Sequence, residues 1–189
     1  MNNIPMFGLP ILFAMIIIRS ITLHHHGIKA IVFGNTDKTD FFIIPGLLFF
    51  IYGITSSLLN FPFPRFLLET FWKLGILYIL SIIICSISLI WFGITLKVFG
   101  KSFRVGIDTN MTEKLLVRGT FSISRNPIYV GFITFFIGLF IAYPNLLSSI
   151  FIIFLVILIH RQILREEKFL KKHYGIEYEE YCKKVRRYL

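Results

Sequence analysis

Long apolar runs alternate with short polar segments along most of the chain. The apolar runs cover residues 4–23, 41–61, 74–96, 127–143 and 146–159. A helix that crosses the ~30 Å hydrocarbon core of a bilayer needs about 20 apolar residues, and the first three runs reach that length. The pattern therefore predicts an all-α integral membrane protein with about five transmembrane helices.

The last two apolar runs are too short to be two independent spans. Residues 126–159 carry no charge, yet two full spans and a turn would need more than about 40 residues. We expect a C-terminal helical hairpin that turns at residues 143–145 and whose other ends continue into the interface. The octapeptide SRNPIYVG, residues 124–131, and the segment after residue 159 should then lie side by side at one membrane surface.

Two polar segments flank this hairpin. The segment that begins at residue 97 mixes glycines with polar and apolar residues, which predicts irregular backbone or a short strand. The segment from residue 161 predicts a helix that extends the fifth run, a break near Gly175 and a second short helix. Together these helices would form a cytosolic helical tail.

The composition agrees with a membrane protein and excludes a soluble domain. Hydrophobic residues make up 56% of the chain and charged residues 16%, whereas soluble domains carry about 45–50% apolar and about 25% charged residues. Cys85 falls inside the third run and Cys182 in the tail. We expect both to be free thiols, because two cysteines so placed cannot make a disulfide framework.

The distribution of lysine and arginine predicts the orientation. Six basic residues lie between residues 97 and 125, and nine lie between residues 161 and 189. Basic loops stay on the cytosolic side, so we expect a multi-pass protein with its N-terminus outside and its C-terminus in the cytosol. The net charge of +10 requires no nucleic-acid partner, because topology and the attraction of membrane lipids with anionic headgroups account for it.

Two polar clusters carry the candidate chemistry, and each alone has an ordinary explanation. Pro127 suits a helix start and Arg125 a membrane boundary. Glu167 could pair with Lys171 on an exposed helix face, while Glu166 has no cation at that spacing. Taken together across the hairpin, an arginine and a tyrosine opposite two carboxylates suit a zwitterionic ligand.

The segments that hold these clusters resemble a known superfamily. They read LLVRGTFSISRNPIYVG at residues 115–131 and REEKFLKKHYGIEYEEYCKKVRRYL at residues 165–189, with the apolar hairpin between them. The pattern is similar to the isoprenylcysteine carboxyl methyltransferase and phospholipid methyltransferase superfamily of integral membrane enzymes. The resemblance implies a methyltransferase that uses S-adenosylmethionine, releases S-adenosylhomocysteine and acts on a lipophilic acceptor at the membrane interface.

The acceptor and the chemistry leave alternatives open. A carboxylate of the isoprenylcysteine type, on a small molecule or a lipidated peptide, is favoured because it is already deprotonated near neutral pH. The alternatives are a phospholipid amine N-methyltransferase, a membrane reductase of the sterol type, and a membrane subunit without catalytic activity.

The resemblance also implies site residues. The catalytic candidates are Arg125, Glu166 and Glu167. The cofactor-binding candidates are Leu116, Val117, Gly119, Arg125, Asn126, Pro127, Tyr129, Val130, Glu166, Glu167, Tyr178 and Tyr181. Arg187 matches the arginine near the end of the family's tail pattern. Residues 97–189 would then form a cofactor-binding region, and residues 1–96 an N-terminal membrane region of three spans.

Two positions depart from the family pattern. Asn126 stands where relatives usually have histidine, and Gln162 where they often have arginine. An amide can donate and accept hydrogen bonds but cannot titrate near pH 7. Asn126 can therefore serve if the position only forms hydrogen bonds, whereas a proton-transfer role would be lost.

The remaining polar motifs predict no further site. Three consecutive histidines, residues 24–26, have side chains that point apart, so we expect no metal site. A glycosylation sequon at Asn110 would lie on the cytosolic side in the predicted topology.

Overall fold

The computed structural model describes residues 4–25, 43–100 and 114–189. Every regular element in these ranges is a helix, as predicted. The α-helices are α1 (Ile4–His25), α2 (Ile43–Leu59), α3 (Gly75–Phe99), α4 (Pro127–Ala142), α5 (Leu146–Tyr174) and α6 (Ile176–Lys184). Two short 3-10 helices are η2 (Arg65–Leu67) and η4 (Gly119–Ser122).

Three helices are long and apolar enough to cross a membrane. They are α1 with 22 residues, α3 with 25 and α5 with 29. The other two apolar helices, α2 and α4, are shorter, with 17 and 16 residues. At a rise of about 1.5 Å per residue, α4 spans only ~24 Å, less than a typical hydrocarbon core. The all-helical class is therefore observed, whereas five complete spans remain a prediction.

The hairpin and the tail follow the predicted boundaries. Helix α4 ends at Ala142 and α5 begins at Leu146. Helix α5 then continues without a break to Tyr174, and Gly175 with φ of 55° separates it from α6. A positive φ favours glycine, so this residue ends one helix and redirects the chain into the next.

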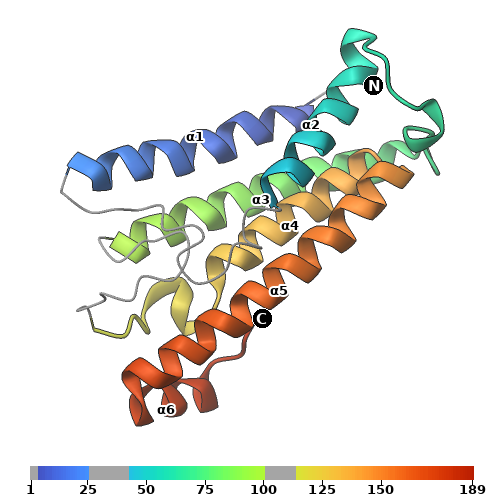
Figure 1. Cartoon of the computed structure of the whole chain (residues 1–189). Helices are drawn as coiled ribbons and strands as arrows, with labels where there is room; N and C mark the ends of the chain where they lie inside the picture. Colours follow the sequence, from blue (N-terminus) through green and yellow to red (C-terminus); the bar gives the residue numbers. More distant parts are fainter. Residues whose placement is uncertain (1–3, 26–42, 101–113) are drawn as a thin grey trace.

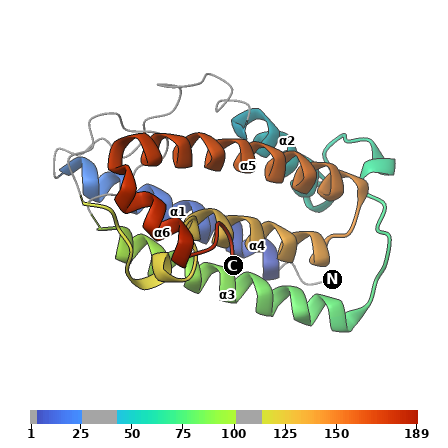
Figure 2. The same cartoon turned by 90° about the horizontal axis from the view of Figure 1, so that it is seen from below.

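The helices run alternately up and down the bundle (Figure 1). Helices α3, α4 and α5 form the centre, with α1 packed on α3 and α4, and α2 packed on α5. Figure 2 shows α6 folded back beside the last turns of α5, with the C-terminus near the start of α4. We call the end of the bundle that holds η4, the start of α4, the last turns of α5 and α6 the polar end.

Aromatic rings and close helix contacts make the core. Phe50 of α2 stacks on Phe151 of α5 with ring centroids 4.1 Å apart, and Phe136 of α4 lies 5.2 Å from the same ring. Gly138 of α4 lies so close to α3 that an added Cβ would sit 2.6 Å from Cys85 Sγ. Small residues permit such close approach between membrane helices, where dispersion contacts drive association.

The turn opposite the polar end is fastened by hydrogen bonds. Asn145 accepts a hydrogen bond from Ser148 N at 2.9 Å and so caps the start of α5. Phe71 N donates to Pro144 O at 2.7 Å, which ties the segment before α3 to the same turn. These contacts fix how α4 and α5 lie against each other, and therefore which of their residues meet at the polar end.

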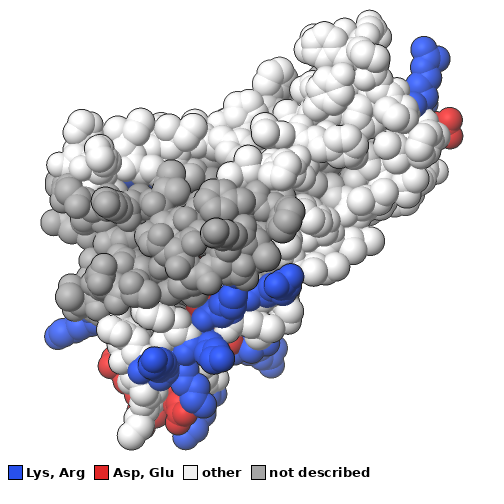
Figure 3. Space-filling view, viewed as in Figure 1, with Lys and Arg blue, Asp and Glu red and all other residues white. Residues whose placement is uncertain are grey.

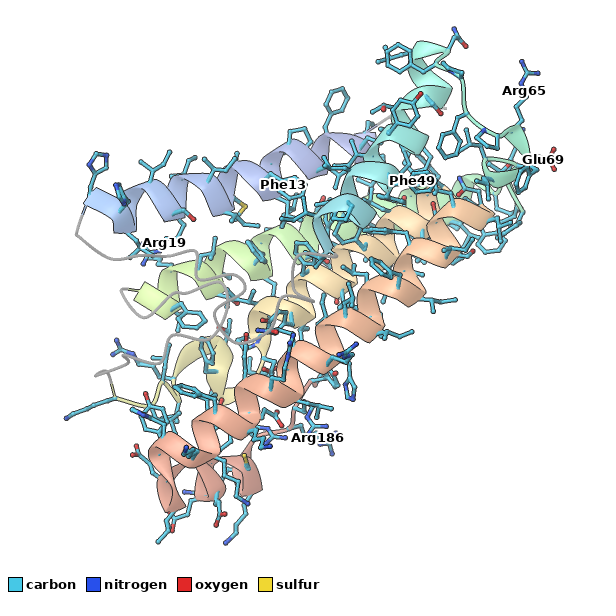
Figure 4. All side chains as sticks on the ribbon, in the orientation of Figure 1. Phe13, Arg19, Phe49, Arg65, Glu69 and Arg186 are labelled. Carbon is cyan, nitrogen blue, oxygen red and sulfur yellow. The ribbon has the colours of Figure 1, made fainter. Side chains whose placement is uncertain are left out.

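Charged side chains gather at the polar end (Figure 3). In the same view the described surface that is visible between the two ends is white, without charged side chains, and Arg65 and Glu69 mark the opposite end (Figure 4). Arg19 donates to Gly100 O, so its side chain is held by the end of α3. The described basic residues just before α4 and those of the tail thus share one end, and the membrane face on which this end lies remains a prediction.

Candidate functional site

The C-terminal segment pairs with the residues just before α4. Ser124 and Arg186 form an isolated parallel β-bridge. Arg125 N donates to Arg186 O at 2.9 Å, and Ser124 Oγ donates to Arg187 O at 3.3 Å. The chain end is therefore held against the start of the octapeptide of residues 124–131, and its side chains join the polar cluster there.

Glu167 is the centre of this cluster. Arg187 donates to Glu167 Oε2 from Nε at 3.1 Å and from its terminal nitrogen at 2.8 Å. Arg125 lies 3.5 Å from Glu167 Oε1, and the exposed fractions of the Arg125 and Glu167 side chains are 13% and 11%. Two guanidinium groups around one carboxylate leave a net positive charge in a largely desolvated place, which suits an additional anion.

Asn126 binds the same carboxylate as a donor. Its side-chain nitrogen donates to Glu167 Oε1 and to Arg187 O, each at 3.2 Å. Both amide hydrogens are therefore engaged with acceptors from two different parts of the chain. This arrangement needs two hydrogens on one nitrogen, which an amide has and an imidazole does not.

Glu166 belongs to a second network on the adjacent face of α5. It accepts hydrogen bonds from the Tyr129 hydroxyl at 2.6 Å and from Gln162 Nε2 at 2.8 Å. Arg165 in turn donates to Gln162 Oε1 at 2.5 Å. Gln162, which departs from the family pattern, thus links an arginine to the Glu166 carboxylate.

The two glutamates do not form a solvated helix face. The alternative pairing of Glu167 with Lys171 is wrong, because Lys171 Nζ lies 3.0 Å from Glu179 of α6 instead. The i,i+4 spacing made that pair possible, but the guanidinium groups of Arg125 and Arg187 bind Glu167 instead. The predicted meeting of Arg125 and Tyr129 with the carboxylate pair is observed.

Tyr178 and Tyr181 of α6 form an aromatic wall beside the cluster. Their ring centroids are 6.1 Å apart, and both residues are buried. The Tyr181 hydroxyl donates to Phe121 O at 2.6 Å, which ties α6 to η4. Burial raises the pKa of both hydroxyls, and the negative charge of Glu167 raises that of Tyr178 further. Both therefore stay neutral hydrogen-bond donors near pH 7.

The other residues predicted to bind the cofactor lie around the cluster and differ in their burial and backbone conformation. Gly119 begins η4 with φ of 62°. Pro127 is the first residue of α4, and its carbonyl accepts a hydrogen bond from Trp91 Nε1 at 2.7 Å. Val130 is buried against the bundle. Leu116 and Val117 lie on the irregular segment before η4, where Val117 is 47% exposed.

Several contacts of the cluster were not predicted. Arg187 matched only the tail pattern, yet it is the closest cation to Glu167. Cys182 was expected to be a free thiol, which is confirmed, and its sulfur also contacts the Arg125 guanidinium. No local spacing could have revealed either contact, because both depend on how the tail folds back. His26 and the sequon at Asn110 lie outside the described residues.

Comparison with known proteins decides the family. A family model described as phospholipid methyltransferase matches residues 71–177, which include η4, α4 and α5. The chain belongs to the phospholipid methyltransferase family. The match contains Arg125, Asn126, Glu166 and Glu167 and ends before Tyr178, so most of α6 and Arg187 lie beyond it.

Curated relatives of this family member point the same way. Two proteins named probable protein-S-isoprenylcysteine O-methyltransferase, from Oryza sativa subsp. indica and subsp. japonica, are each 35% identical to it over 89 residues. The aligned part covers 46% of this chain and 47% of each relative, so about half of their length is matched. No solved structure matches. The resemblance inferred from the motifs is confirmed, and the names indicate a methyltransferase.

Proposed function

We propose that this protein transfers a methyl group from S-adenosylmethionine to a lipophilic acceptor at the membrane interface. The cofactor would bind at the polar end, within the region of residues 97–189, while residues 1–96 form the accompanying membrane region. The observation that carries the proposal is the network in which Glu167 holds two arginines and Asn126 beside the Glu166–Tyr129 pair.

The donors of this network fit a zwitterionic cofactor. Arg125 Nε is buried and has no hydrogen-bond partner within the described ranges. A buried N–H without an acceptor is costly, and the carboxylate of an amino acid would satisfy it while balancing the net positive charge. The Glu166 carboxylate lies next along α5 and would face the ammonium group. Tyr129 adds an aromatic face that attracts a sulfonium cation.

The residues of the site would bind and orient rather than transfer protons. Bound S-adenosylmethionine supplies a methyl group already activated by the positive sulfur. Arg125 and Asn126 lie just before α4, and an ion pair and a hydrogen bond join them to Glu167 of α5, so their geometry is set before a ligand arrives. Fixed geometry and exclusion of water can supply much of the acceleration of such a displacement.

The surroundings of the glutamates favour a carboxylate acceptor. An amine must lose a proton before or during methylation, and that proton needs a base. Both glutamates are occupied as acceptors by tyrosine, amide or guanidinium donors. A carboxylate of the isoprenylcysteine type needs no base, and the names of the rice relatives support the same acceptor class.

Cofactor binding is the first test. Purified protein in lipid nanodiscs should bind radiolabelled S-adenosylmethionine, and Arg125→Ala should weaken binding at least about tenfold, because loss of one partner of a desolvated ion pair costs about 2–5 kcal/mol. Arg161→Ala is the matched control, since Arg161 is an exposed arginine of α5, and its affinity should equal that of the wild type. Equal affinities in all three proteins would refute the site.

The nature of the product tests the acceptor. Membranes that contain the protein are incubated with labelled cofactor and either a farnesylated cysteine derivative or phosphatidylethanolamine. Methyl esters are hydrolysed by alkali and release volatile methanol, whereas methylated amines are stable. We expect alkali-labile label on the cysteine derivative. Alkali-stable label on the phospholipid would establish the amine acceptor instead.

A further inference from the structure

His160 of α5 and Tyr188 of the tail form a hydrogen-bonded pair that the proposed cofactor site does not use. His160 Nδ1 and the Tyr188 hydroxyl lie 2.6 Å apart, and the two rings stack with centroids 6.3 Å apart. Tyr188 also packs against the hydrophobic core. The preceding residue, Arg187, binds Glu167. Two consecutive residues of the tail therefore contact α5 at points about two helical turns apart.

The pair is not needed to hold the C-terminal segment in place. The β-bridge at Arg186 and the ion pair of Arg187 already fasten this segment. His160 uses only Nδ1 for the contact with Tyr188, and its Nε2 has no hydrogen-bond partner among the described residues. When the Tyr188 hydroxyl donates to Nδ1, the hydrogen of the neutral ring lies on Nε2. The pair then presents one oriented N–H donor to a ligand.

An apolar stripe on α5 leads from the bilayer to His160. Ile153 and Ile157 share the helix face of His160 and Glu167, since residues separated by three, four or seven positions lie above one another. The two isoleucines are 61% and 54% exposed. On a helix long enough to cross a membrane, such exposed apolar side chains contact lipid. His160 therefore lies where lipid-facing side chains give way to the charged residues of the polar end.

We propose that His160 binds the carboxylate of the lipophilic acceptor through its Nε2–H, and that Tyr188 is a positioning residue that fixes the ring. The prenyl chain of the acceptor lies in the lipid along the stripe of Ile153 and Ile157. A hydrogen bond to a carboxylate is stronger than one between neutral groups. The inference rests on the proposed function, because it names the residue that binds the acceptor of that reaction.

The position of His160 along α5 suits this role. It lies seven residues before Glu167, which places it about 10 Å deeper in the bundle at a rise of about 1.5 Å per residue. Tyr129, which would face the sulfonium, also lies deeper than Asn126, because α4 begins at the polar end. One carboxylate oxygen of the acceptor attacks the methyl carbon, a C–O bond forms, and the S–C bond breaks with both electrons left on the sulfur. No proton moves, so His160 donates a hydrogen bond and does not act as a base.

Paired substitutions at His160 separate binding of the acceptor from support of the fold. In His160→Asn the amide nitrogen lies near the position of Nδ1, so Tyr188 keeps a polar partner while the donor at the Nε2 position is lost. In His160→Gln the longer side chain carries a donor to the Nε2 position. His173→Leu is the matched control, because His173 is an exposed histidine of the same helix.

Two assays are applied to each protein in nanodiscs. Methyl transfer to a farnesylated cysteine derivative gives KM for the acceptor and kcat. Binding of labelled S-adenosylmethionine gives the cofactor affinity and shows whether the variant is folded.

We expect His160→Asn to raise KM for the acceptor by about 10- to 150-fold, as for loss of a hydrogen bond to a charged group. Tyr188→Phe should raise KM by about 2- to 12-fold, as for loss of a hydrogen bond between neutral groups. His160→Gln and His173→Leu should stay within about threefold of the wild type. Cofactor affinity should be unchanged in all four variants, because none of these side chains binds Glu167.

A second measurement requires no turnover. A farnesylated cysteine with a photoreactive group on its prenyl chain is crosslinked to the protein, and the modified peptide is identified by mass spectrometry. We expect crosslinks on α5 around Ile153 and Ile157. Unmodified farnesylated cysteine should displace the probe at a lower concentration than its uncharged carboxamide does. In His160→Asn the two competitors should act alike, because the group that distinguishes them is absent.

Three results would overturn the inference and leave the proposed function intact. An unchanged KM in His160→Asn would show that Nε2 does not bind the acceptor. A loss of cofactor affinity equal to the rise in KM would show that the pair only supports the tail. Crosslinks confined to other helices would show that the prenyl chain follows another path.

The remaining outcomes also decide. If neither His160 variant folds, an unchanged KM in Tyr188→Phe, or equal displacement by the two competitors in the wild type, would refute the inference. A wild-type protein that binds S-adenosylmethionine but does not methylate the cysteine derivative would overturn the acceptor class together with the role of His160. Failure of the wild type to bind S-adenosylmethionine would overturn the proposed function itself.

Discussion

Glu167→Gln should destabilise the protein, because this carboxylate holds the polar end together. Its Oε2 accepts two hydrogen bonds from Arg187, and its Oε1 accepts one from Asn126 beside Arg125. Glutamine has the same size but only one acceptor oxygen, and its NH₂ group would meet donors at the other position. The substitution therefore leaves the two guanidinium groups without their shared counter-ion.

The magnitude can be worked from burial. Removing one partner of a buried, hydrogen-bonded ion pair costs about 3–5 kcal/mol. The Arg187 side chain is 36% exposed, so solvent compensates part of its loss. The Arg125 side chain is only 13% exposed and receives little compensation. We therefore expect a loss of about 2–3 kcal/mol, below the value for a fully buried pair.

Thermal unfolding in nanodiscs, without added cofactor, measures this loss. A decrease of about 2–3 kcal/mol corresponds to a midpoint about 4–12 °C lower in a chain of this length. Glu179→Gln is the matched control, because Glu179 pairs with Lys171 where both side chains are about half exposed or more, and its midpoint should stay close to that of the wild type. Equal midpoints for the two variants would refute the reasoning that burial makes the Glu167 pairs strong.

The remaining predictions concern three other features. Asn126→Leu should lower methyl transfer by about 5- to 150-fold, since unmet hydrogen bonds in a buried site cost about 1–3 kcal/mol; Asn126→His, which keeps one donor, should stay within about tenfold of the wild type, and a gain above tenfold would indicate a proton-transfer role. Gly119→Ala should cost about 1–3 kcal/mol of stability, because φ is 62° and the new Cβ would lie 2.9 Å from Val98 Cγ2; an unchanged unfolding midpoint would contradict this. A cysteine placed at Lys183 should resist membrane-impermeant reagents in intact cells if the tail is cytosolic, and labelling there would invert the proposed topology.

The helices were predictable because each depends on a local pattern. The apolar runs predicted α1 and α3 close to their observed ends, the last apolar run and the polar segment after it together predicted α5, and Gly175 predicted the break before α6. The turn of the hairpin followed from the length of one uncharged stretch. Helices and helix breaks of this kind are determined by the transfer of apolar residues out of water and by the backbone preferences of single residues. Both effects depend only on residues that are close together in the chain.

The partners of the site residues were not predictable in the same way. Glu167 has Lys171 one helical turn away, and local spacing made that pair the obvious choice. The observed partner, Arg187, is 20 residues away along the chain. It reaches Glu167 only because α6 folds back and the chain end pairs with Ser124.

The sequence by itself determined that this is a helical membrane protein of the phospholipid methyltransferase family, with arginine, tyrosine and glutamate side chains at one end of a hairpin. Composition and motif were sufficient for this, because long apolar runs identify helices that can be buried in lipid and the spacing of the motif residues identifies the family. Only the tertiary structure decided which charges meet. Ion pairs depend on distances of a few ångströms between segments far apart in the chain, and packing of α6 and the C-terminus sets those distances at Glu167, Arg125 and Cys182.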